Sequence, residues 1–182
     1  METITDKLKN VRAALGERFG YTNMFQAPRL GKIVVSTGVG STIDKEKLRI
    51  VPERLALITG QKPSARAAKK SIASFKVREG SVVGHTVTLR GARMRAFLEK
   101  FIHVALPRTR DFGGISPKAI DDMGNLTIGI KEHTIFPETS DEELKNVFGM
   151  AITLVSTAKD KEEALAFFTH LGVPFKKETN EK

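Results

Sequence analysis

Several residue types are absent or scarce in this chain of 182 residues. There is no cysteine, which excludes disulfides, thiolate metal ligands and a thiol nucleophile. There is no tryptophan and only one tyrosine, so stacking on rows of aromatic side chains is not the expected way of binding bases. Apolar runs are a few residues long, too short for a membrane span. The first ten residues lack the apolar stretch of a secretory signal, and we expect a cytoplasmic protein.

Patterns typical of catalytic sites are also missing. Residues 38–41 (GVGS) follow a predicted strand, but neither a P-loop lysine nor a third glycine completes a nucleotide-binding motif. The four histidines lack metal-ligand spacing, and residues 121–125 (DDMGN) are typical of a hairpin turn. We therefore expect no enzymatic activity, no metal, no cofactor and no small-molecule substrate.

The positive charge is concentrated in the middle of the chain. The formal net charge is +9. Residues 1–60 carry ten Lys and Arg against six Asp and Glu, residues 61–131 fourteen against five, and residues 132–182 six against ten. A basic middle and an acidic last third indicate two surfaces for two kinds of partner.

The densest basic segment points to a phosphate backbone. Residues 62–78 hold six basic residues and no acidic one: Lys62, Arg66, Lys69, Lys70, Lys76 and Arg78. A threonine-containing strand follows and ends in Thr88-Leu89-Arg90. Arginine and hydroxyl side chains suit phosphate oxygens and the ribose 2′-OH. The pattern predicts recognition of a folded RNA through its backbone and shape, with strong salt dependence.

Hydrophobic periodicity predicts alternating helices and strands. Helices are expected over 3–19 and 44–59, along the apolar stripe from Met94 to Ala105, and after the capping residue Asp160. Strands are expected over 29–39, 82–89, 126–131 and 150–157. The fold class is α+β, with one mixed or antiparallel sheet, helices mainly on one face, and the other face binding RNA. We expect one domain over 1–182, with a basic protruding loop at 62–80 and an acidic C-terminal third at 132–182.

Short segments along almost the whole chain resemble one family. They are 26–29 (QAPR), 37–40 (TGVG), 59–63 (TGQKP), 69–80 (KKSIASFKVREG), 87–91 (VTLRG), 107–112 (PRTRDF), 124–125 (GN), 135–138 (IFPE) and 174–177 (PFKK). In this order and spacing they resemble the fifth protein of the bacterial large ribosomal subunit, a family that binds 5S rRNA. The resemblance implies a small sheet packed on helices, one face of which grips 5S rRNA in the central protuberance.

The resemblance also implies roles for individual residues. The expected 5S rRNA contacts are Lys32, Ser36, Gln61, Lys62, Thr88 and Arg90, with Lys9, Asn10 and Arg12 as weaker suggestions. The loop segment Ser74, Phe75, Lys76, Val77 and Arg78 is similar to the part that reaches the P-site tRNA. The acidic residues Glu132, Glu138, Asp141, Glu142 and Glu143 are similar to the part that touches a basic small-subunit protein in an intersubunit bridge. The implied partners are therefore 5S rRNA, large-subunit rRNA, P-site tRNA and that small-subunit protein, with no membrane.

One position departs from the family pattern. Many relatives have asparagine where this chain has Ser36, whose side chain is shorter and has one donor. The RNA contact expected there is therefore water-mediated or lost.

Two other functions are alternatives to the ribosomal one. A free-standing RNA-binding or regulatory protein would use the same sheet face. A phosphate-handling enzyme built on residues 38–41 is a weaker alternative, because no base or metal site accompanies the turn.

Overall fold

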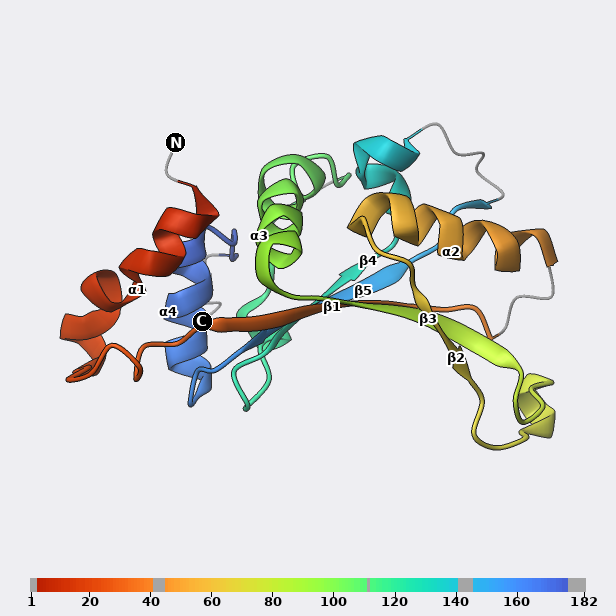
Figure 1. Cartoon of the computed structure of the whole chain (residues 1–182), viewed down its shortest axis with the longest axis horizontal. Coiled ribbons are helices and arrows are strands. Elements are labelled where there is room, and N and C mark those ends of the chain that lie inside the picture. Colours follow the sequence, from red (N-terminus) through yellow and green to blue (C-terminus); the bar gives the residue numbers. More distant parts are fainter. Residues whose placement is uncertain (1–2, 41–44, 111, 141–145, 177–182) are drawn as a thin grey trace, which may run out of the picture. The chain divides into compact units, whose positions relative to one another are not determined.

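The computed structural model describes residues 3–40, 45–110, 112–140 and 146–176, and side chains of 45–48 are outside that description. Four α-helices and five strands make up most of this part of the chain (Figure 1). Their bounds are α1 (Ile4–Phe19), β1 (Leu30–Gly38), α2 (Lys45–Thr59), β2 (Ser64–Ala67), β3 (Val82–Leu89), α3 (Gly91–Lys100), β4 (Leu126–Ile130), β5 (Met150–Ser156) and α4 (Lys161–Leu171). The predicted α+β class is confirmed.

The strands form one five-stranded sheet in the order β2-β3-β1-β5-β4. β3 is antiparallel to both β1 and β2. By contacts the chain divides into two compact units. Unit 1 comprises 1–32, 90–128 and 153–182, and unit 2 comprises 33–89 and 129–152.

In unit 1, α1 packs against α4 (Figure 1). α1 buries Ile4, Val11 and Leu15, the apolar stripe that its sequence predicts. α4 presents a longer buried set: Ala164, Ala166, Phe167, Phe168 and Leu171. Burying a Val, Leu, Ile or Phe side chain contributes about 1.5–3 kcal/mol, and this contact therefore supplies much of the unit's core.

The ends of these two helices follow from their capping residues. The Thr3 hydroxyl accepts a hydrogen bond from the Asp6 backbone N–H at 3.2 Å. The Asp160 carboxylate accepts one from the Glu163 N–H at 2.9 Å, as the capping pattern predicts. Both helices end at glycines with positive φ, Gly20 at 66° and Gly172 at 97°.

The third helix of unit 1 changes its winding near its end. α3 buries Met94, Phe97 and Leu98, and the chain continues as a π-helical turn, Phe101–Ala105. The Leu106 N–H bonds to the Phe101 carbonyl at 2.9 Å, and helical structure stops before Pro107. This end agrees with the sequence, because proline cannot continue the hydrogen-bonding ladder.

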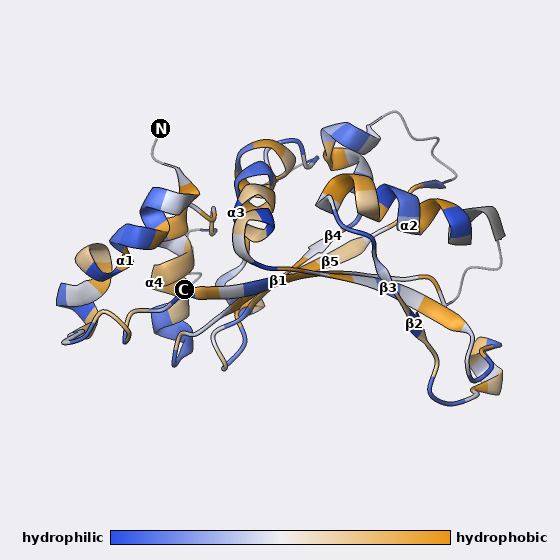
Figure 2. Cartoon of the chain, in the orientation of Figure 1, coloured by the Kyte–Doolittle hydropathy of each residue, from blue (hydrophilic) through white to orange (hydrophobic). Residues whose placement is uncertain are grey.

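In unit 2, α2 contacts β3 and covers one face of the strands. It runs through Pro52 without ending and buries Val51, Leu55 and Ile58. The strands turn Val35, Val87 and Leu89 inward, and these side chains are at most 1% exposed. Figure 2 shows hydrophobic and hydrophilic residues following one another along α2.

One strand was not expected. Residues 64–67 were predicted as the start of a loop, but they form β2, an edge strand paired with β3. All four residues, SARA, are exposed, so no alternation of apolar and polar residues marks the segment as a strand. Pairing with the β3 backbone holds it in the sheet. Between β4 and β5 the described residues include two 3-10 turns, His133–Ile135 and Pro137–Thr139.

Candidate nucleic-acid interface

The half-exposed face of β1 and β3 in unit 2 is polar. Ser36 is the Cα partner of Thr86, and Val34 is the partner of Thr88. All four are partly exposed, whereas the residues between them on each strand are buried. Because side chains alternate along strands, α2 covers one face and the hydroxyls of Ser36, Thr86 and Thr88 share the other.

Gln61 is fixed beside this face. The Thr59 hydroxyl donates to the Leu55 carbonyl at 2.6 Å within α2 and accepts from the Gln61 N–H at 3.4 Å across the turn that follows. The Gln61 Nε2 then donates to the Thr88 carbonyl at 3.2 Å. Lys62 follows as an exposed cation just before β2. The structure therefore brings together Gln61 and Thr88, two of the expected 5S rRNA contacts that lie 27 residues apart in sequence.

Ser36 and Thr37 point to opposite faces of β1. The Thr37 hydroxyl is buried and donates to the Gly149 carbonyl at 2.7 Å. It therefore stabilises the fold and is not available to a ligand. Ser36 is half-buried on the opposite face and is the residue of the pair that can meet RNA.

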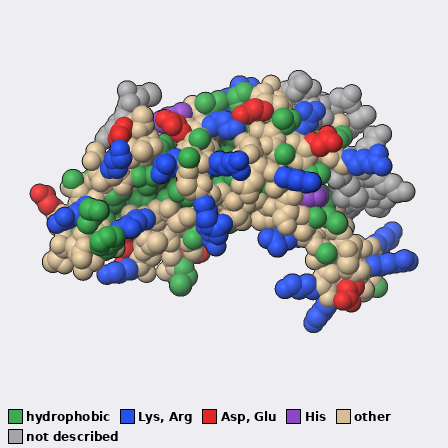
Figure 3. Space-filling model, viewed as in Figure 1, with side chains coloured by type: hydrophobic (Ala, Val, Ile, Leu, Met, Phe, Trp, Pro, Cys, Tyr) green, Lys and Arg blue, Asp and Glu red, His purple; other side chains and the backbone are tan. Residues whose placement is uncertain are grey.

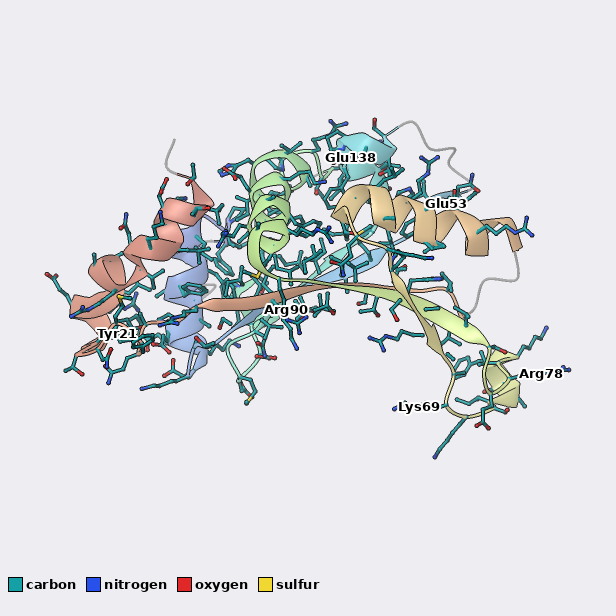
Figure 4. All side chains as sticks on the ribbon, viewed as in Figure 1. Tyr21, Glu53, Lys69, Arg78, Arg90 and Glu138 are labelled. Atoms are coloured by element: carbon teal, nitrogen blue, oxygen red, sulfur yellow. The ribbon has the colours of Figure 1, made fainter. Side chains whose placement is uncertain are left out.

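Five of the expected 5S rRNA contacts belong to unit 1. Lys9, Asn10 and Arg12 are exposed on α1. Lys32 is half-buried on β1, and Arg90 is exposed at the position that precedes α3. Arg90 has extended backbone angles, φ −139° and ψ 164°, and makes no side-chain cap for that helix (Figure 4).

The basic loop is a folded hairpin end. Ile72 and Val77 exchange two backbone hydrogen bonds at 2.9 and 3.2 Å around the 3-10 turn Ala73–Phe75. The Lys76 N–H bonds to the Ala73 carbonyl at 3.0 Å, and Lys76 has the left-handed φ of 52°. The Ser71 hydroxyl accepts from the Glu79 N–H at 2.9 Å.

Cationic side chains surround this hairpin end. Figure 3 shows Lys and Arg side chains extending from it in several directions, and Figure 4 shows Lys69 and Arg78 projecting outward. Of the expected tRNA contacts, Ser74, Lys76 and Arg78 are exposed, while Val77 is half-buried. The Phe75 side chain is 70% exposed and, with Ile72 and Val83, lines an open apolar hollow. The sequence indicated the charges but not this hollow.

The expected bridge residues are only partly described. Glu132 and Glu138 are exposed; Glu132 precedes the 3-10 turn His133–Ile135, and Glu138 lies within the turn Pro137–Thr139. His133, between these two residues in sequence, is buried, and its ring stacks on Phe148 with centroids 4.1 Å apart. Its Nδ1 accepts from the Phe148 N–H at 3.3 Å. Asp141, Glu142 and Glu143 lie outside the described residues.

Asp121, an acidic residue in the turn before β4, has a structural role. Asp121 accepts from the N–H groups of Met123 and Asn125 at 3.1 and 2.7 Å, which confirms the predicted turn. These bonds, with the Asn125 side-chain amide, lower the Asp121 pKa.

Within 3–40, 45–110, 112–140 and 146–176, no cluster of three His, Asp or Glu suits a metal ion. In the same ranges no helix has the length and apolar character needed to cross a membrane.

Two features of unit 1 and unit 2 escaped sequence reasoning. In unit 1, Met24 and Phe25 are large apolar side chains left exposed beside the Arg29 guanidinium. In unit 2, His85 is 7% exposed, and its Nδ1 has no hydrogen-bond partner. Burial lowers the pKa of His85, so its neutral form is favoured. No motif marks these positions; only the pairing of β3 and the turn after α1 reveal them.

Comparisons with known proteins cover nearly the whole chain. Residues 23–78 match the family described as ribosomal protein L5, and residues 82–175 match the family described as the C-terminus of these ribosomal proteins. The chain is 51% identical over 174 residues to the large ribosomal subunit protein uL5 of Desulfatibacillum aliphaticivorans, covering 95% of this chain and 97% of the relative. It is 48% identical over 169 residues to the uL5 protein of Anaeromyxobacter sp. (strain K), covering 92% and 94%.

An α+β sheet with a basic hairpin, together with these matches, defines a ribosomal protein, a class that binds RNA and is not enzymatic. Within this class the chain belongs to the uL5 family of the large subunit. It is therefore a structural, rRNA-binding constituent of a ribonucleoprotein and resides in the ribosome, which is cytoplasmic in bacteria. The expected family is confirmed.

Proposed function

We propose that the chain attaches 5S rRNA to the central protuberance through the polar face of β1 and β3. The observation that carries this proposal is the fixed group on unit 2: Ser36, Thr86 and Thr88 on one face, with Gln61 bonded to the Thr88 carbonyl. α2 packs against β3 behind this face, and we expect this packing to hold the face rigid. A rigid face loses little conformational entropy on binding a folded RNA.

The chemistry of this face suits an RNA backbone and ribose. Hydroxyl groups donate to phosphate oxygens and exchange hydrogen bonds with the 2′-OH. Exposed Lys62 adds a positive charge beside Gln61. Lys32 and Arg90, carried by the same strands or directly after them, are proposed to add phosphate contacts, which position the RNA without reading its sequence.

The basic hairpin end is proposed to contact the P-site tRNA. Exposed Lys76 and Arg78 extend from a turn that is closed by its own backbone bonds, so both are presented for contact with a phosphate backbone. Exposed Glu132 and Glu138 are proposed to meet a basic small-subunit protein. Opposite charges across such a contact steer association and fix its orientation.

The first test is a titration of the purified protein with 5S rRNA and with a structured RNA of equal size, each across a range of salt concentrations. We expect a preference for 5S rRNA that persists as the salt-sensitive part of the affinity decreases. Equal affinity for both RNAs, lost together as salt rises, would contradict the 5S assignment.

The second test uses Arg90→Ala. Loss of a charge-assisted contact is expected to weaken 5S rRNA binding by about 1.5–3 kcal/mol. Arg49→Ala is the matched control, because Arg49 is an exposed arginine on α2, the helix that covers the other face of the strands in unit 2. Unchanged affinity of the Arg90 variant would remove Arg90 from the site.

A further inference from the structure

An exposed aromatic side chain follows α1 in unit 1. Phe25 is 72% exposed and its neighbour Met24 is 60% exposed. Large apolar side chains exposed together indicate an interaction site more often than a single one does. These two residues form, with Lys9, Arg12 and Arg29, a surface that we call the Phe25 platform.

The turn that presents Phe25 is held by local hydrogen bonds. The Gln26 side-chain oxygen accepts from the Thr22 N–H at 2.9 Å and from the Asn23 N–H at 3.3 Å. The Phe25 N–H donates to the Asn23 side-chain oxygen at 3.1 Å. The exposure of Phe25 is therefore a property of a fixed turn.

Arg29 stacks on the Phe25 ring. Its guanidinium carbon lies 4.7 Å from the ring centroid, within the range of a cation–π contact. The Arg29 backbone is anchored, because its N–H donates to the Thr157 hydroxyl at 2.9 Å and its carbonyl accepts from the Thr157 N–H at 3.0 Å. With Arg29 over the ring and 72% of the residue exposed, the ring keeps open surface for a second flat group.

The hollow beside the Phe25 ring is lined by apolar and cationic side chains. An open hollow of about 400 Å³ is lined by Met24, Phe25 and by apolar residues of α1 and of the segment before β1. Lys9, Arg12 and Arg29 are the charged residues in this lining, and none of its residues is acidic. A flat apolar surface next to three positive charges complements a nucleobase attached to phosphates.

We propose that the Phe25 platform binds an unpaired base of ribosomal RNA. The base stacks on the Phe25 ring, and Lys9 and Arg12 bind the neighbouring phosphates. This inference rests on the rRNA binding of the family and adds a contact separate from the polar face of β1 and β3. An exposed ring accepts any base by stacking, and sequence preference is therefore expected to be small.

The absence of tryptophan from the chain allows a direct test. Phe25→Trp introduces a single indole, whose fluorescence falls when a base stacks on it. Met123→Trp is the matched control, because Met123 is 74% exposed and lies in a turn of the same unit. The probes are 5S rRNA, large-subunit rRNA, a fully paired RNA duplex and purified large-subunit proteins.

We expect quenching of the Phe25→Trp emission by at least one of the two ribosomal RNAs, no quenching by the duplex, and no quenching of Met123→Trp. Unchanged emission with an RNA that filter binding shows to be bound would overturn the proposal. So would emission that responds only to purified large-subunit proteins, which would indicate a protein partner instead.

Affinities separate stacking from charge. Phe25→Ala and Phe25→Leu are expected to weaken binding of the quenching RNA roughly 5- to 150-fold, with an unchanged slope of log affinity against log salt. Lys9→Ala and Arg12→Ala are expected to reduce that slope by about 0.7–0.9 each. Thermal unfolding checks that each variant folds. If the Phe25 variants bind normally while Arg90→Ala loses 5S rRNA affinity, this inference fails and the proposed function stands; if 5S rRNA is not preferred at all, the proposed function fails.

Discussion

His85 gives unit 2 a dependence on pH. Burial lowers its pKa below the ordinary value of 6.5, so the unfolded chain binds a proton more readily than the folded chain. The stability that depends on the neutral ring is therefore complete above about pH 6.5 and decreases as the pH falls through the folded-state pKa.

Replacing this ring is expected to flatten the acid side of the stability profile. In urea unfolding from about pH 7.5 down to about pH 5, His85→Val should lose less free energy of unfolding than the parent chain, because no buried imidazole must be protonated. His103→Gln, a change at an exposed histidine, is the control and should keep the parent's profile. Identical profiles for the His85 variant and the parent would contradict this account.

Gly84 is required where β3 pairs with β1. A Cβ added there would lie 2.7 Å from the Thr37 carbonyl oxygen, and this backbone atom is held in the sheet. We expect Gly84→Ala to lower the free energy of unfolding by about 1–3 kcal/mol, as overpacking of a well-packed site does. At Gly129 on β4 an added Cβ meets nothing within 4 Å, so Gly129→Ala should change little. Equal effects of the two substitutions in denaturant unfolding would show that the close approach at Gly84 is relieved without cost.

In the proposed function the hairpin end between β2 and β3 contacts the P-site tRNA, whereas the polar face of β1 and β3 binds 5S rRNA. Neutralising Lys76 and Arg78 should leave 5S rRNA affinity within about twofold, because no residue of the polar face is altered, and should weaken P-site tRNA binding. Lys76 has a φ of 52°, which strains most residue types but is adopted more readily by Asn. Asn is therefore the suitable replacement for Lys76. The variant is therefore Lys76→Asn with Arg78→Gln.

Filter binding of tRNA to the P site of reconstituted ribosomes measures the second effect. Arg108→Gln with Lys118→Gln removes the same charge from two exposed positions of unit 1 and is the control. A large loss of 5S rRNA affinity in the hairpin variant would instead make the hairpin part of the 5S site.

Periodicity and capping predicted the helices and the four longer strands. Ile4, Val11 and Leu15 mark α1, and Asp160 followed by Glu163 marks the start of α4, because these signals are local. β2 could not be predicted, since its exposed SARA segment becomes a strand only by pairing with β3. The proximity of Gln61 to Thr88 likewise depends on where β3 lies, although residue chemistry and the family resemblance both suggested these residues as RNA contacts.

Exposure was the hardest property to predict. The scarcity of aromatic residues argued against base stacking, yet Phe25 and Phe75 are among the most exposed large hydrophobic side chains of the described residues. Composition counts aromatic residues without showing which of them the core leaves out. The arrangement in one domain and the individual RNA contacts of Lys32, Ser36 and the other site residues stay predictions.

The uneven charge of the whole chain leads to a prediction about assembly. Residues 61–131 carry fourteen basic and five acidic residues, whereas 132–182 carry six and ten, so the segments favour partners of opposite sign. Glu132→Lys with Glu138→Lys reverses two exposed charges of the acidic segment. We expect 5S rRNA binding and incorporation into large subunits to be retained, and association with small subunits to weaken, more so at low salt.

Sedimentation of reconstituted subunits across magnesium and salt concentrations measures this association. Glu17→Lys with Glu99→Lys is the control, because it makes the same change of charge at two exposed helix positions in unit 1. A uniform effect of net charge would weaken association equally in both variants, whereas a bridge contact would weaken it only in the first. Normal association of the Glu132 and Glu138 variant would remove these residues from the bridge, and the acidic segment would then be a solvated surface without a cationic partner.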